Sequence, residues 1–180
     1  LDSLFVIEEG VVGDDASPDI SGLIGQYAQG NEPGHHIPYL FSYVGQPWKT
    51  AKLIREITDK FYTTKPDGLC GNEDLGQMSA WYIFSAMGFY SVNPANGIYV
   101  LGSPLVNNAV INYKEGISFQ LTAINNSSTN MYIQKTEYNG KPYTKSYITH
   151  DMIVKGGELK LYMGRTPSST WGVKKEDRPL

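Results

Sequence analysis

Two short polar segments carry the side chains of this sequence that could bind ligands or move protons. They span residues 30–36 and 71–78, and the candidate side chains are those of Asn31, Glu32, His35, His36, Asn72, Glu73, Asp74 and Gln77. Each segment leads into an apolar stretch with helical spacing, so we expect both at helix N-termini. Free backbone N–H groups and the helix dipole favour anions and oxygen-rich ligands at such ends.

Asp74 is followed three residues later by Gln77, a spacing typical of a capping box. The simplest interpretation is that Asp74 only caps the helix. However, Glu73 stands beside it, and adjacent carboxylates before an apolar helix are costly unless a nearby group uses them. A carboxylate at a helix N-terminus is stabilised in its charged form, so we expect a lowered pKa for Asp74 and a role as general base rather than proton donor. A glycosidase would need a second carboxyl group elsewhere.

The first segment offers oxygen and nitrogen ligands. Glu32 precedes a proline, which favours an extended backbone. The oxygens of Asn31 and Glu32 suit calcium, which takes about six to eight oxygen ligands, although an ordinary hydrogen-bonded turn also fits. A zinc site at His35 and His36 is less favoured than a hydrogen-bonding role, because neighbouring residues do not easily reach one ion and Cys70 is a lone sulfur. Hydrogen bonds to sugar hydroxyls, or a place at the helix entry, suit these histidines better.

Composition excludes several classes of function. With 15 Lys+Arg against 18 Asp+Glu, the chain has a formal charge of -3 and no basic block, which argues against a nucleic-acid partner. A content of 41% hydrophobic and 18% charged residues is typical of folded chains. The sequence has no run of about 18 apolar residues, so it does not predict a membrane-spanning helix. The first residues contain neither Met nor a basic stretch, so we expect the chain to begin inside a longer protein.

The elements that must position the polar segments follow from two periodicities. Apolar spacing predicts helices over residues 37–44, 47–62 and 75–87, and the third has almost no polar face, so we expect it to be buried on every side. After residue 97 the apolar period is two, which predicts an antiparallel sheet or sandwich-like region. The fold class is therefore α+β, with a helical part over residues 1–97 and a β-rich part over residues 98–180.

Three long motifs in this order resemble the end of the catalytic region of glycoside hydrolase family 92. They are GNEPGHHIPYLF at 30–41, GQPWKT at 45–50 and GNEDLGQMSAWY at 71–82, and a weaker likeness covers residues 139–171. The resemblance implies a calcium-dependent α-mannosidase that releases terminal mannose from glycans with inversion. Its catalytic domain would be an (α/α)6 toroid joined to a β-sandwich, and our helices would be part of that toroid.

The resemblance also implies roles for individual residues. Asp74 matches the general base, Asn72 stands where some members have a second acid, and Asn31 and Glu32 fall where calcium and substrate are bound. The candidate catalytic residues are thus Asn72, Glu73 and Asp74, the substrate contacts Glu32, His35, His36 and Gln77, and the calcium ligands Asn31 and Glu32. The general acid and the β-sandwich are expected upstream, so we expect the isolated chain to be inactive. Bacterial export to the periplasm or cell surface, for N-glycan degradation, is the implied setting.

Two other functions remain open. The chain could be a stand-alone carbohydrate-binding or scaffold module in which the acidic segments only cap helices. It could also belong to another toroidal glycosidase, similar to glucoamylase, that uses no calcium. The apolar helix at 75–87 separates the first of these from an enzyme fragment, because a free-standing module should cover that helix internally and a fragment should leave an apolar face open.

Overall fold

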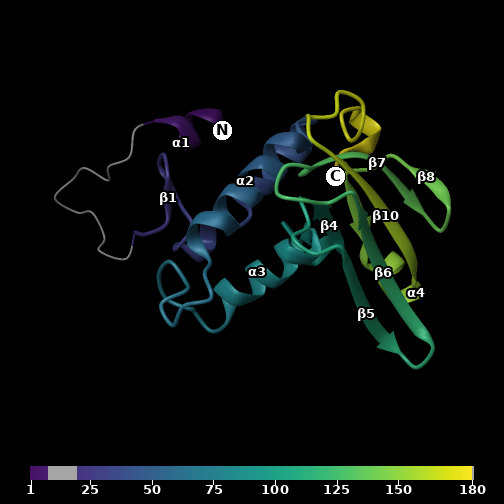
Figure 1. The fold of residues 1–180 in the computed structure, drawn as a ribbon, viewed down its shortest axis with the longest axis horizontal. Helices are drawn as coiled ribbons and strands as arrows, with labels where there is room; N and C mark the ends of the chain where they lie inside the picture. The colour runs from purple at the N-terminus through teal and green to yellow at the C-terminus, as the bar shows by residue number, and fades with distance from the viewer. Residues whose placement is uncertain (8–19, 180) are drawn as a thin grey trace.

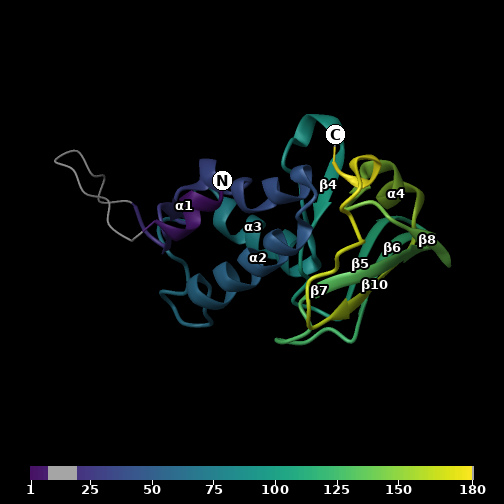
Figure 2. The same ribbon diagram turned by 90° about the horizontal axis from the view of Figure 1, so that it is seen from above.

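The computed structural model describes residues 1–7 and 20–179, which form a helical part and a β-rich part. The helical part contains α1 (Asp2–Val6), the short hairpin β1 (Leu23–Ile24) and β2 (Tyr27–Ala28), the 3-10 helices η1 (Glu32–Gly34) and η2 (Ile37–Val44), α2 (Pro47–Phe61) and α3 (Gln77–Met87). Seen from above, these helices lie to one side of the sheets, with β4 (Ile98–Leu101) nearest to them (Figure 2).

The predicted helices form close to their predicted bounds. Gly45 adopts a left-handed conformation with φ 74° and ends η2, and Pro47 starts α2 in the first turn, where its missing N–H is not needed. The apolar stripe of α2 buries Ala51, Ile54 and Ile57, as its spacing predicts.

The β-rich part consists of two sheets (Figure 1). The smaller has the order β3 (Phe89–Tyr90), β4, β9 (Tyr147–Thr149). The larger has the order β5-β6-β10-β7-β8, with bounds Asn108–Lys114, Ile117–Ile124, Gly157–Gly164, Tyr132–Tyr138 and Lys141–Tyr143, in that order. Only β6 and β10 run parallel among these pairs. The short helix α4 (His150–Lys155) connects β9 to β10, and the η3 (Pro94–Asn96) and η4 (Lys175–Asp177) turns complete the elements. The α+β class is confirmed.

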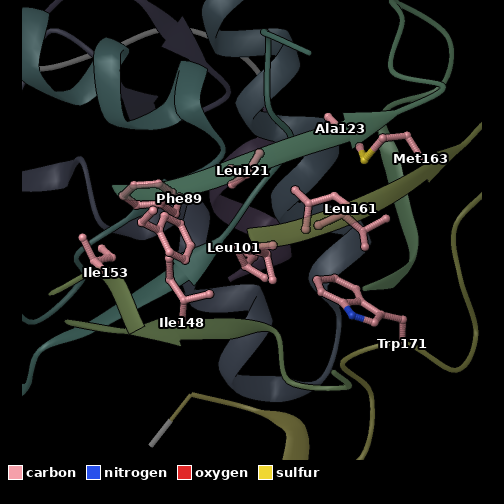
Figure 3. Close-up of a cluster of buried hydrophobic side chains, with 12 residues drawn as sticks. Phe89, Leu101, Leu121, Ala123, Ile148, Ile153, Leu161, Met163 and Trp171 are labelled. Atoms are coloured by element: carbon pink, nitrogen blue, oxygen red, sulfur yellow. The ribbon is translucent and has the colours of Figure 1, made fainter. Parts of the chain in front are cut away.

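The core of the β-rich part lies between the two sheets. Figure 3 shows Phe89, Leu101 and Ile148 of the smaller sheet turned toward Leu121 and Leu161 of the larger one. All five side chains are at most 1% exposed. Their burial makes the region sandwich-like, because each sheet contributes one apolar face to a shared interior.

The helical and β-rich parts share a seam. Val100 of β4 packs into the helical core with Ile54 and Trp81. The guanidinium of the buried Arg55 on α2 donates from Nε to the Ser103 hydroxyl, at 2.8 Å. Strand β3 lies before the domain boundary predicted at residue 97 and β4 lies after it, yet the two strands pair. The two parts are therefore packed together at this boundary.

The prediction that the third helix is buried on every side is wrong for the described residues. In α3 the side chains of Met78, Trp81 and Ser85 are buried, whereas Tyr82 and Ile83 are 36% and 56% exposed. The reason is that the described elements pack against one side of α3 only. An apolar face is therefore left open, as a fragment of a larger domain should leave it. None of the described helices is long and apolar enough to cross a membrane.

Candidate functional site

The structure brings the two polar segments together at the N-terminal end of α3. The backbones touch at two glycines, since a Cβ on Gly71 would lie 3.3 Å from the Cα of Gly30. The side-chain amide of Gln77 donates to Nδ1 of His35 at 3.2 Å, and the Trp81 indole donates to the His35 carbonyl at 3.0 Å. Residues more than 40 positions apart in the sequence therefore form one site.

His35 joins the two segments from inside the protein. Its side chain is 1% exposed, and its Nε2 donates to the carbonyl of Gln29 at 2.9 Å. In the neutral imidazole Nδ1 is then the acceptor for Gln77, so both ring nitrogens are engaged. Burial lowers the pKa of His35, against smaller opposing effects of the Gln29 hydrogen bond and the Asp74 charge. His36 is partly exposed and precedes η2, which fits a helix-entry position.

The predicted capping box at Asp74 is wrong. The residue at the N-cap of α3 is Gly76, and Asp74 and Leu75 before it have left-handed backbones, with φ 50° and 55°. This turn carries the Asp74 side chain away from the helix amides. The capping carboxylate is Glu73, which accepts from the backbone N–H of Ser79 at 2.9 Å and from its hydroxyl at 2.7 Å. These two donors lower the pKa of Glu73.

The expected lowering of the Asp74 pKa is also wrong, because the helix amides do not contact its carboxylate. A hydrogen bond with the Glu32 carboxyl group raises the pKa of Asp74, and partial desolvation and the charges of Glu32 and Glu73 add to the rise. The His35 ring opposes it weakly. Asp74 is exposed, so its carboxylate is open to water and to a ligand.

The oxygen donors at this site suit a hard cation in kind but are too few to hold one. The side chains of Asn31 and Asn72 are exposed beside the Glu32–Asp74 pair, and carboxylates and amides are typical calcium ligands. Within residues 1–7 and 20–179, however, no group of three or more His, Cys, Asp or Glu side chains is placed to hold a metal ion. We therefore derive no chemical step through calcium.

A buried hydrogen-bond network that the sequence did not predict lies behind the site. The hydroxyl of Tyr27 donates to Oε1 of Gln29 at 2.6 Å, and Nε2 of Gln29 donates to the Tyr62 hydroxyl at 2.8 Å. Tyr62 stacks on Trp81, with ring centroids 5.7 Å apart. Gln29 is fully buried immediately before the first polar segment, and its polar side chain beside a tyrosine-rich pattern was the only local signal of this network.

Comparison with known proteins identifies the family. Residues 1–165 match the family model described as the glycosyl hydrolase family 92 catalytic domain. Because the match covers most of the chain, the chain belongs to this family.

Particular relatives agree with this assignment. The chain is similar to a family 92 α-mannosidase from Bacteroides thetaiotaomicron solved with mannoimidazole, with a TM-score of 0.92 and 44% identity over 99% of this chain and 23% of that one. A second enzyme of that organism, described as an inverting mannosidase, gives a TM-score of 0.84 and 40% identity over 99% of this chain and 25% of its own.

A curated relative gives the same picture at lower identity. It is an uncharacterized secreted glycosidase of Arthroderma benhamiae, 30% identical over 83% of this chain and 20% of its own length. The chain thus spans about a quarter of the solved relatives and a fifth of the curated one.

Proposed function

We propose that the protein containing this chain is an exo-acting α-mannosidase that hydrolyses terminal α-linked mannose from glycans, and that these residues form part of its catalytic site. The observation that carries the proposal is the meeting of the two polar segments, which the Gln77–His35 hydrogen bond joins, beside the exposed carboxylate of Asp74. The family membership and the mannosidases among the solved relatives support the substrate class.

In the proposed reaction Asp74 is the general base of a single displacement with inversion. Its carboxylate takes a proton from a water molecule while the water oxygen bonds to the anomeric carbon of mannose. The bond to the leaving-group oxygen breaks, and that oxygen receives a proton from an acid. In inverting enzymes the acid and the base lie about 6.5–9.5 Å apart. Among the described carboxylates we assign none to the acid, so we place it in another part of the protein.

Calcium is a further part of the proposal, supported by the oxygen donors at the site. Asn31 and Glu32 would contribute ligands, and the remaining ligands would come from other parts of the protein. When bound, the ion would contact hydroxyls of the sugar. Export from the cell, to the periplasm, the cell surface or the medium, is likewise proposed, and the secreted relative supports it.

The open face of α3 supports an enzyme segment over a stand-alone binding module. Tyr82 and Ile83 lie beside a groove of about 390 Å³ that Tyr62, Thr63 and Leu69 also line. A free-standing module would leave this apolar surface in contact with water. The chain's share of about a quarter of its solved relatives agrees with the same interpretation.

The test is mannose release from α-linked mannobioses by the longest natural protein that contains these residues. Asp74→Asn should lower kcat by about 10²–10⁴-fold, because it removes the proton acceptor. The matched control is Asp67→Asn, an exposed carboxylate in the preceding loop, which should keep normal activity. Full activity in the Asp74→Asn variant would refute the assignment of the base. Rapid mannose release by the isolated 180-residue chain would instead refute the placement of the acid in another part of the protein.

A further inference from the structure

Glu73 and Asp74 supply the acceptors for the first three N–H groups of α3. The first four N–H groups of a helix have no partner within it. Here the N–H of Gln77 bonds to the Asp74 carbonyl at 3.1 Å, and that of Met78 bonds to the Glu73 carbonyl at 3.2 Å. The N–H of Ser79 bonds to Oε1 of Glu73. Glu73 therefore satisfies two of these groups, one with its backbone and one with its side chain.

The turn between Glu73 and α3 is strained. Asp74 and Leu75 are consecutive residues with positive φ, a conformation that residues with a Cβ adopt reluctantly. Such strain persists only where the surrounding structure holds it. The Leu75 side chain is fully exposed, so packing of Leu75 does not hold the turn. The contacts that close it run from Glu73 to Ser79, on the two sides of the strained pair.

We infer that Glu73 is a positioning residue, which holds the Asp74 carboxylate beside Glu32 by clamping the turn to Ser79. Both carboxylate oxygens of Glu73 are engaged by Ser79, one by the N–H and one by the hydroxyl, so Glu73 is turned toward the helix. Asp74 is the residue whose carboxyl group meets Glu32. The two adjacent acids thus have separate tasks. This inference rests on the proposed function where it concerns catalysis.

Two replacements of Glu73 distinguish a clamp from a catalytic carboxylate. In Glu73→Gln the amide oxygen can still accept from the Ser79 N–H and the NH₂ group can donate to its hydroxyl, so the clamp is kept without the charge. In Glu73→Ala the clamp is lost. We expect Gln to retain most of the mannose release and Ala to lower kcat about 10- to 100-fold with little change in KM, because a misplaced base weakens only the transition state.

Ser79→Ala tests the other half of the contact. It removes the hydroxyl bond to Oε2 and keeps the N–H bond to Oε1, so its loss of kcat should be smaller than that of Glu73→Ala. The double variant should lose no more than Glu73→Ala alone, since both changes act through one contact. Equal loss in Glu73→Gln and Glu73→Ala would overturn the inference and make Glu73 a catalytic acid or base. Unchanged kcat in Glu73→Ala would overturn it as well.

A measurement that needs no activity separates this inference from the proposed function. Deuterium uptake of the segment 73–80, followed by peptide-level mass spectrometry on the full-length protein, should rise in Glu73→Ala and stay normal in Glu73→Gln. Uptake at the far end of α3, where the Gly88 N–H bonds to Phe84 and Ser85, should be unchanged and serves as the folding control. If the unsubstituted protein released no mannose, the proposed function would fail, while uptake unchanged by Glu73→Ala would refute the clamp.

Discussion

Replacing Arg55 with alanine should destabilise the chain, because this side chain joins the helical part to the β-rich part. Arg55 is 8% exposed. Its guanidinium donates to the Ser103 hydroxyl, to the Pro104 carbonyl and to Oδ1 of Asn126. Ser103 and Pro104 keep a second partner each after the substitution, through the Met131 carbonyl and the Asn126 amide. The Asn126 oxygen loses its only guanidinium contact.

The size of the effect follows from these contacts. A hydrogen bond from a charged donor contributes about 1.5–3 kcal/mol, and Arg55 makes three of them. Ordering the side chain costs about 2 kcal/mol of rotamer entropy. Burial also disfavours the charged guanidinium, since it lowers the pKa of Arg55, and this reduces the net stabilisation. Taking the low end for each bond and subtracting the entropy leaves a net loss of about 2–3 kcal/mol.

Urea denaturation of the 180-residue chain measures this loss. With an m-value of about 2 kcal/mol/M, Arg55→Ala should lower the unfolding midpoint by about 1 M with m unchanged. The midpoint of Arg55→Lys should lie between those of the unsubstituted chain and Arg55→Ala, because lysine keeps the charge but lacks the planar guanidinium that reaches several acceptors. The control is Lys52→Ala, an exposed cation on the same helix, which should change stability by less than about 0.5 kcal/mol. An Arg55→Ala midpoint equal to that of the Lys52 variant would refute the seam as described.

Three further predictions concern a thiol, a helix end and the metal. Burial raises the pKa of Cys70 from the ordinary thiol value of 9.0 to about 11. At pH 8 its alkylation by iodoacetamide should therefore be about a hundredfold slower than that of an unburied thiol, and the rate should rise as the pH approaches 11. Gly88→Ala, at φ 103° with the new Cβ 3.0 Å from Pro104, should lower the free energy of unfolding by about 2–3 kcal/mol. The control Gly116→Ala has φ 73° and an open Cβ site and should cost about 1–2 kcal/mol. Removing calcium with a chelator should abolish mannose release, and added calcium should restore it; activity unaffected by the chelator would refute the calcium proposal.

The sequence predicted the elements that local physics controls. Gly45 and Pro47 mark the junction between η2 and α2 because one favours a left-handed end and the other a helix start. The Asn-Gly pair at residues 139–140 is a typical two-residue hairpin signal, and the structure has a hairpin there with Tyr138 opposite Lys141. Asn139 and Gly140 have φ 49° and 75°, as a two-residue hairpin turn requires.

Features that depend on distant residues could not be predicted in the same way. The parallel pairing of β10 with β6 depends on α4 returning the chain across the sheet, and alternation of apolar residues is the same for either direction. The open face of α3 depends on which elements are present to cover it. The left-handed turn at Asp74 and Leu75 has no glycine to reveal it, so the spacing of Asp74 and Gln77 indicated a capping box that does not form.

That turn changes the chemistry expected of the proposed base. An aspartate that capped α3 would have a lowered pKa and would be a weak proton acceptor. Because the turn moves Asp74 from the helix amides to Glu32, its pKa is raised instead. Glu73 takes the capping position and has the lowered pKa. The backbone between two adjacent acids thus turns one toward the helix amides and the other toward Glu32, and shifts their pKa values in opposite directions.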